Sequence, residues 1–348
     1  MEGEESRCRG CLLGAWVGDA FGGVLEFGGI PSAEAIRQAW TMPGGGAHRL
    51  GPGQVTDDSE MGLSLFRGLL AGNSAINLNQ IATWYGKWFD SHPFDVGSTI
   101  RKSVGKAVHM TQHQAEMMRR GANGAGESQS NGCLMRIAPL AVFVRRLARE
   151  EAALAVREEV GLTHVNATVQ WACVLYCLAI GFLIREGGNR QGAWAYAKEF
   201  VQESGNPEIR TWIAAIEDPG EEVAVNRKSG WAKIAVVHGF RSLLGGMSYS
   251  QALESVVAQG GDTDTNACII GALLGAADGQ NCLPASSLSA VLAFSPKVHG
   301  GIPRPTWLQP SSVYPLIPQF LALSPSLLTL VGGREEYVKK AENQRGNG

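Results

Sequence analysis

The chain has 348 residues, of which 45% are hydrophobic and 18% are charged, so it can bury a sizeable core and does not have the composition of a disordered protein. Lys and Arg number 30 against 32 for Asp and Glu, and the formal charge of -2 provides no basic field to hold a polyanion. We therefore expect no nucleic-acid partner.

The sequence also gives no sign of a membrane or secretory segment. Residues 1–5 include three glutamates where a secretory signal would begin. The most apolar stretch, Trp171 to Ile184, is shorter than the roughly 18–20 residues that cross a bilayer. We expect a cytoplasmic protein without membrane contact. Its cysteines, such as Cys173 and Cys177 on one apolar helical face, are then expected to be reduced and packed.

Helical periodicity dominates the chain. Apolar residues recur every four positions from Met61 to Leu69, and residues 164–186 and 265–278 show similar apolar faces. Patterns typical of strands are scarce, and Gly and Pro separate the periodic segments. No repeat or linker divides the chain. The sequence predicts an all-α protein with one domain over residues 1–340 and a disordered tail over 341–348.

Two stripes of small residues predict a close contact between helices. Their members stand four positions apart: Gly10, Gly14, Gly18 and Gly22 in the first, and Ala267, Gly271, Gly275 and Gly279 in the second. Because each stripe gives its helix a flat strip, we expect both helices to lie deep in the core. The alternative is that these glycines only loosen the helices, by about 1 kcal/mol each relative to alanine.

The first acidic segment begins a helix. Thr56 stands at an N-cap position, and Asp57, Asp58 and Glu60 follow in the first turn before the apolar series from Met61. Acidic first turns also stabilise ordinary helices by complementing the helix dipole. This segment alone therefore leaves both a metal site and a plain helix start open.

A second segment of the same kind changes that balance. Asp262, Asp264 and Thr265 again place carboxylates and a hydroxyl at the start of an apolar helix. The two segments together offer four carboxylates and two hydroxyls, with no nitrogen or sulfur ligand, and hard cations prefer such oxygen donors. The sequence predicts a site for two Mg²⁺ ions, or Mn²⁺, held by Thr56, Asp57, Asp58, Asp262, Asp264 and Thr265. Substitution of Glu60 is expected to have little effect.

Five motifs in order resemble the ADP-ribosylglycohydrolase family. They are Gly18-Asp19-Ala20 followed by Glu26, Thr56-Asp57-Asp58-Ser59-Glu60-Met61, Asn131-Gly132-Cys133-Leu134-Met135-Arg136, Thr163-His164, and Gly260-Gly261-Asp262-Thr263-Asp264-Thr265-Asn266-Ala267. The resemblance implies a single-domain orthogonal bundle of helices with two magnesium ions at the bottom of a cleft, held by the six residues named above.

The resemblance also implies residues that bind the substrate. Glu26 is similar to the family's carboxylate near the reacting ribose, and its alternative role is that of an exposed loop acid. The glycine-rich stretch from Gly121 to Gly132 resembles a cradle for phosphate and ribose, although such loops are usually only turns. In this cradle the resemblance assigns Ser128, Asn131 and Gly132 to the diphosphate and ribose.

Two further positions concern this cradle. Where the family typically has Ser-x-Gly-Asn-Gly, the chain has a serine, Ser130, in place of the first glycine. His164 matches a ligand-contacting histidine in the family. Its alternative role is that of a surface or helix-capping histidine.

Asp95 is carried over from arginine-directed members of the family as an acceptor for a guanidinium. A carboxylate and a guanidinium pair through two parallel hydrogen bonds, which a serine hydroxyl could not reproduce. Asp95 also precedes a predicted helix, so its alternative role is that of an N-cap.

These features predict an ADP-ribosyl glycohydrolase that cleaves the N-glycosidic bond between ADP-ribose and a protein side chain, with arginine preferred. Its substrate would be an ADP-ribosylated protein and its product ADP-ribose. Either Glu26 or Asp57 would take the proton of the attacking water. The alternatives are hydrolysis of serine-linked, nucleic-acid-linked or free ADP-ribose derivatives, and a relative that binds ADP-ribose without catalysis.

Overall fold

Two helices in backbone contact form the centre of the molecule. In this computed structural model, α1 (Glu2–Gly23) lies antiparallel to α14 (Thr263–Asp278). A Cβ atom added at Gly14 would lie 2.4 Å from the carbonyl oxygen of Gly271, and one added at Gly18 would lie 2.2 Å from that of Ala267. Real Cβ atoms do not approach backbone so closely, so the glycine stripes permit the contact. The prediction that both helices lie deep in the core is confirmed.

The structure describes residues 2–110 and 112–325, so the predicted tail over 341–348 lies outside the described residues. The other α-helices are α2 (Ala33–Ala39), α3 (Asp57–Ala71), α4 (Leu78–Asp90), α5 (Ser98–Val104), α6 (Gln114–Ala122), α7 (Ala138–Phe143), α8 (Arg149–Val160), α9 (Ala167–Arg185), α10 (Arg190–Ser204), α11 (Pro207–Glu217), α12 (Ala232–Leu244), α13 (Tyr249–Val257), α15 (Ala285–Ala293), α16 (Pro296–His299), α17 (Pro310–Val313) and α18 (Ile317–Leu321). Short 3-10 helices are η1 (Asn123–Ala125), η2 (Asn131–Cys133), η3 (Gln280–Cys282), η4 (Thr306–Leu308) and η5 (Tyr314–Leu316).

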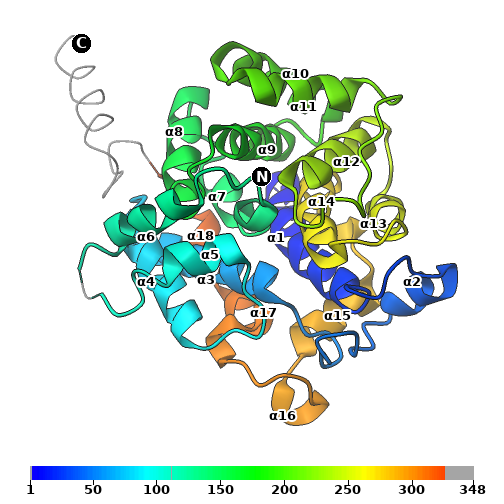
Figure 1. The fold of residues 1–348 in the computed structure, drawn as a ribbon. Helices are drawn as coiled ribbons and strands as arrows, with labels where there is room; N and C mark the ends of the chain where they lie inside the picture. The colour runs from blue at the N-terminus through cyan, green and yellow to red at the C-terminus, as the bar shows by residue number, and fades with distance from the viewer. Residues whose placement is uncertain (1, 111, 326–348) are drawn as a thin grey trace, which may run out of the picture.

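The remaining helices surround the central pair. Figure 1 shows α8 to α12 above α1 and α14, α3 to α6 at the lower left, and α15 to α17 below. In residues 2–110 and 112–325 the only bridges outside helices are two isolated antiparallel ones, between Gly45 and Leu50 and between Ser130 and Trp231. The predicted all-α fold is confirmed.

The apolar segment predicted at 171–184 is part of a longer helix. α9 has 19 residues, and by length and composition alone it could cross a membrane, so the argument from shortness was wrong. However, 89% of its apolar window is buried by other parts of the protein, which is the environment of a core helix. The described cysteines are free, and Cys173 and Cys177 are buried, as expected.

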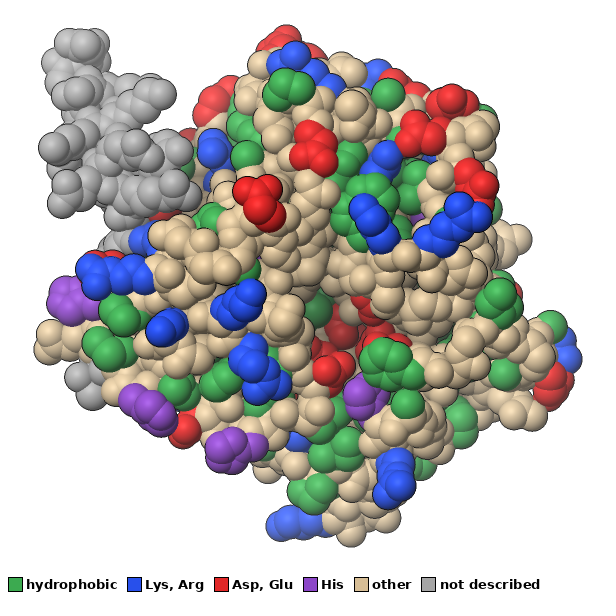
Figure 2. Space-filling model, viewed as in Figure 1, with side chains coloured by type: hydrophobic (Ala, Val, Ile, Leu, Met, Phe, Trp, Pro, Cys, Tyr) green, Lys and Arg blue, Asp and Glu red, His purple; other side chains and the backbone are tan. Residues whose placement is uncertain are grey.

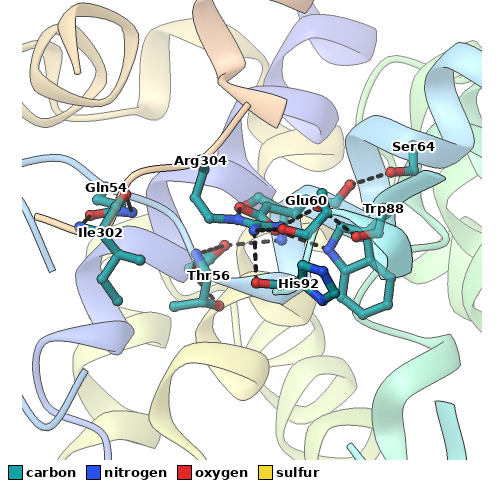
Figure 3. A network of polar contacts seen from close by, with 11 residues as sticks. Gln54, Thr56, Glu60, Ser64, Trp88, His92, Ile302 and Arg304 are labelled. Carbon is teal, nitrogen blue, oxygen red and sulfur yellow. Dashed lines mark hydrogen bonds and ion pairs between the residues drawn. The ribbon is translucent and has the colours of Figure 1, made fainter. Parts of the chain in front are cut away.

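Glu60 holds the C-terminal part of the chain against α3 (Figure 3). Its two carboxylate oxygens accept hydrogen bonds from Arg304 at 2.7 and 2.8 Å, and one also accepts from Trp88 at 2.9 Å. Arg304 in turn donates to the carbonyls of Ser91 and His92. Glu60 is buried in the interior, with only 1% of its surface exposed. The expectation that a change at Glu60 has little effect concerned the rate, which stays a prediction, whereas this network gives Glu60 a part in stability.

We predict that Glu60→Gln lowers the free energy of unfolding by about 3–5 kcal/mol, because it leaves the guanidinium of Arg304 buried without its counter-ion. Thermal and denaturant unfolding followed by circular dichroism measures this. Glu34→Gln is the matched control, since Glu34 pairs with Arg37 on the exposed face of α2 and its loss should change little. Equal stability of both variants would show that the network of Glu60 does not hold the fold.

Candidate active site

The carboxylate of Asp19 joins the end of α1 to the start of α3. Its oxygens accept hydrogen bonds from the backbone N–H of Thr56 at 3.1 Å and of Ser59 at 3.0 Å. Thr56 stands at the N-cap position of α3 as predicted, but its side chain makes no capping hydrogen bond. Asp19, from a helix distant in sequence, therefore caps α3.

Because Asp19 caps α3, the polar side chains at the start of this helix can make other contacts. Thr56 Oγ1 lies 2.9 Å from Asp19 Oδ1 and 2.9 Å from Asp58 Oδ2, although a hydroxyl has only one hydrogen to donate. Asp262 likewise stands at the N-cap position of α14 without capping it. Its Oδ2 instead accepts a hydrogen bond from Asn131 Nδ2 at 2.7 Å. A plain helix start does not account for either segment.

The two acidic segments open into one cavity of about 300 Å³. Figure 2 shows a hollow near the centre of the displayed face in which Asp and Glu side chains gather. The cavity is lined by Glu26, Phe27, Asp57, Asp58, Asp95, Gly97, Ser98, Thr99, Ile100, Ser130, Asn131, Gly132, Met135, Ser229, Gly230, Asp262, Asp264 and Thr265. Of the six predicted metal ligands, only Thr56 is absent from this lining, and it lies directly behind Asp58.

Carboxylate oxygens at the cavity wall and behind it form two overlapping groups. Oxygens of Asp19, Asp58 and Asp264 lie within 4.8 Å of one another, as do those of Glu26, Asp262 and Asp264. Asp264 belongs to both groups, which fits two adjacent cation positions. Asp57 lies outside both groups but lines the same cavity. Asp19 and Glu26 were not predicted as ligands.

Burial raises the pKa of several of these acids, and repulsion between neighbouring carboxylates adds to it at Asp57 and Asp264. Burial, followed by the charge of Asp58, raises the pKa of Asp57 well above its usual value. Burial and the charges of Asp58 and Glu26 do the same to the pKa of Asp264. Burial raises the pKa of Asp19 to about 6, although hydrogen bonds from Ser59 and Thr56 oppose this.

In the described parts of the chain no Lys or Arg pairs with these carboxylates, and of the acids in the two groups only Glu26 contacts a histidine, His48. None of the ion pairs found there involves Asp19, Asp57, Asp58, Asp262 or Asp264. Asp58 Oδ1 is moreover buried and accepts no hydrogen bond. An all-oxygen set of close, unpaired carboxylates is the environment that a hard divalent cation stabilises. The residues present therefore fit magnesium or manganese.

A histidine that sequence reasoning missed connects two loops at the rim of the cavity. His48 Nε2 lies 3.0 Å from Glu26 Oε2 and 3.7 Å from Asp95 Oδ2. The rings of Phe27 and Phe94 flank its imidazole, with centroids 5.6 and 5.4 Å away. Nothing local in the sequence links these residues, because the contact depends on how three loops meet.

Glu26 is buried at the cavity wall, so the alternative of an exposed loop acid is wrong. Burial and the nearby charge of Asp262 raise the pKa of Glu26 to about 7, against the lowering effect of hydrogen bonds such as that with His48. A carboxyl group with such a pKa can exchange a proton near neutral pH.

Asp95 also lies on the cavity wall, with 36% of its side chain exposed. The helix after it, α5, begins at Ser98 and has Gly97 at its N-cap position, without a side-chain cap. The alternative that Asp95 caps this helix is wrong, and its carboxylate faces the cavity rim beside His48.

Only one end of the predicted cradle reaches the cavity. Ser130, Asn131 and Gly132 line it, whereas Gly121 is part of α6. The backbone N–H of Asn131 donates to the carbonyl of Gly230 at 2.9 Å, which adds residues 229–230, missed in the sequence, to the wall. Because Asn131 also holds Asp262, its side chain supports the acidic cluster as well as the cradle.

The other two predicted cradle residues lie behind the wall. Ser128 Oγ is 2.7 Å from Thr99 Oγ1, and Thr99 lines the cavity. His164 is 1% exposed, so it is not a surface histidine. Its Nε2 is 2.8 Å from Ser130 Oγ, so Ser130 stands between the imidazole and the cavity.

The sequence is similar to that of known ADP-ribosyl glycohydrolases. The family model described as ADP-ribosylglycohydrolase matches residues 1–308. The ADP-ribosyl-[dinitrogen reductase] glycohydrolase of Rhodospirillum rubrum is 30% identical over 292 residues, which cover 81% of this chain and 89% of that protein. An ADP-ribosylarginine hydrolase of Serratia proteamaculans is 29% identical over 195 residues, 54% of this chain and 50% of its own.

A solved structure has the same fold. An ADP-ribosylglycohydrolase-related protein complex superimposes with a TM-score of 0.69 at 24% identity, covering 83% of this chain and 93% of that chain. The family match spans most of the sequence and includes both acidic segments, the Glu26 loop and the Asn131 loop. We conclude that the chain belongs to the ADP-ribosylglycohydrolase family of enzymes.

Proposed function

We propose that this enzyme hydrolyses the bond between C1 of the distal ribose of ADP-ribose and an arginine side chain of a modified protein, with two magnesium or manganese ions as cofactors. The observation that carries the proposal is the buried cluster of carboxylates without Lys or Arg partners, most of which line the cavity. Support for an ADP-ribosylated protein as substrate comes from the names of the relatives.

The acidic cluster would hold the ions through Asp58, Asp262 and Asp264, with Asp57 and the hydroxyls of Thr56 and Thr265 beside them. Bound there, divalent cations would fix ribose hydroxyls and favour ionisation of an attacking water. Asp19 keeps Thr56 and the start of α3 in position, since it caps that helix. Asn131 orients Asp262 by donating to one of its oxygens.

We assign the role of general base to Glu26 rather than to Asp57. Glu26 lies on an irregular loop at the cavity wall, where His48 contacts one of its oxygens. Asp57 is instead part of the first turn of α3, beside Asp58. Cleavage develops positive charge at C1 of the ribose, and a carboxylate facing that carbon would also stabilise it.

The arginine preference rests on Asp95. Its carboxylate lies at the rim, on the way out of the cavity, and no Lys or Arg pairs with it among the described residues. A guanidinium leaving group could therefore bind there through parallel hydrogen bonds. The name of the arginine-directed relative supports arginine as the modified side chain.

We predict that chelation abolishes turnover and that magnesium or manganese raises the melting temperature of the chelated protein. Binding to the folded state alone contributes about 2.7 kcal/mol at a concentration one hundred times the dissociation constant. Differential scanning fluorimetry and elemental analysis measure stabilisation and metal content. Full activity in excess EDTA, with no metal bound, would refute the cofactor proposal.

Asp264→Asn and Glu26→Gln should separate metal binding from proton transfer. Asp264→Asn should lose both turnover and stabilisation by magnesium, because both groups of carboxylates share this residue. Glu26→Gln should lower kcat by roughly a hundredfold, in the range of general-base effects, and keep that stabilisation. Asp90→Asn, at an exposed position of α4, is the control and should change neither. Loss of stabilisation in Glu26→Gln would make Glu26 a metal ligand instead of the base.

Asp95→Asn should reduce release of ADP-ribose from arginine-modified peptides by roughly tenfold or more, because a charge-assisted pair is lost. Turnover of serine-modified peptides, measured in parallel, should change little. A wild-type enzyme that prefers the serine peptide would contradict the arginine assignment itself. If the variant instead retains the wild-type preference for arginine, only Asp95 is removed from the proposal.

A further inference from the structure

A buried chain of hydrogen bonds leads from the core to the cradle wall, and it begins at Arg136. This side chain is fully buried, and Glu159 and Tyr85 hold its guanidinium. One hydrogen of its NH2 group points to Glu159 at 3.0 Å, and the other to Thr163 Oγ1 at 2.7 Å. A guanidinium can only donate, so Thr163 Oγ1 must accept.

The hydroxyl hydrogen of Thr163 is then available for His164. Thr163 has one hydrogen left to donate, and its remaining partner is His164 Nδ1 at 2.8 Å. With that hydrogen donated to Nδ1, the imidazole is neutral and carries its own hydrogen on Nε2. Nε2 then donates to Ser130 Oγ at 2.8 Å.

Ser130, the last residue in this series of hydrogen bonds, has a hydroxyl hydrogen available for another partner. Ser130 Oγ accepts from His164, so its own hydrogen can point elsewhere, and the contact found for it is Thr99 Oγ1 at a long 3.3 Å. Thr99 Oγ1 has a closer partner in Ser128, at 2.7 Å. Ser130 lines the cavity, and its backbone (φ -71°, ψ 155°) is one that any residue adopts, so no glycine is needed here.

We propose that Ser130 binds the ligand directly, by donating its hydroxyl hydrogen to an acceptor oxygen of ADP-ribose, and that His164 is a positioning residue that acts through it. This rests on the proposed function. It changes the role expected for His164, which in this chain does not reach the cavity. It also assigns a role in binding to Ser130, which replaces a glycine of the family motif.

Calorimetry with free ADP-ribose and Mg²⁺ tests this proposal. Ser130→Ala and Ser130→Gly should each weaken binding by roughly tenfold, the effect of one hydrogen bond to a charged or strongly accepting oxygen. The metal content and melting temperature should stay as in the wild type. Ser103→Ala is the matched control, because Ser103 is a buried serine of α5 whose hydroxyl donates to the carbonyl of Leu162, away from the cavity.

A double-mutant cycle tests the role of His164. His164→Ala should weaken ADP-ribose binding in the wild-type background, but it should add little once Ser130 is alanine, because both changes remove the same interaction. His164→Gln, whose amide nitrogen can replace Nε2 as donor, should restore part of the affinity. Additive losses would show that His164 does not act through Ser130 and would overturn that part.

Binding of ADP identifies the acceptor oxygen. A loss with both ADP and ADP-ribose would place Ser130 at the diphosphate, and a loss confined to ADP-ribose would place it at the distal ribose. Unchanged ADP-ribose affinity in both Ser130 variants, with wild-type binding intact, would overturn the inference and leave the proposed function standing. Absence of ADP-ribose binding by the wild type would instead refute the proposed function.

Discussion

The site depends on the contact between the backbones of α1 and α14. Gly10, Gly14, Gly18 and Gly22 let the two helices approach until carbonyl oxygens of one occupy the space of Cβ atoms on the other. This contact fixes the register of the pair, with the end of α1 beside the start of α14. Asp19 and Asp264 consequently face each other in one acidic group, and Asp19 still reaches the first turn of α3.

The second constraint is electrostatic. A polar side chain at an N-cap usually bonds to the backbone of its own helix, but Thr56 and Asp262, at the N-caps of α3 and α14, do not. With Asp19 as the cap of α3, those oxygens are free to converge, at the cost of concentrating negative charge in the interior. Cations that neutralise the charge would offset that cost, so metal binding would stabilise the fold.

Side chains from segments distant in sequence form two parts of the cavity wall. His48 connects the Glu26 loop to Asp95 on one wall, where the bond would be cleaved and the leaving group bound. On the other wall Arg136 anchors the cradle from behind through Thr163 and His164. The fully buried ion pair of Arg136 and Glu159 stands behind that wall.

The sequence by itself determined the local features: the helix starts with their acids, the glycine stripes and the apolar helical faces. These follow from interactions within a few residues, so spacing alone reveals them. Family motifs added Glu26, Asn131 and the cradle. Only the tertiary structure decided which partner each polar atom has, as in the cap of α3 by a residue 37 positions away, the pairing of Glu60 with Arg304 across 244 positions, and the place of Ser130 in front of His164. Such partners depend on how helices and loops pack in three dimensions, and no periodicity along the chain encodes that packing.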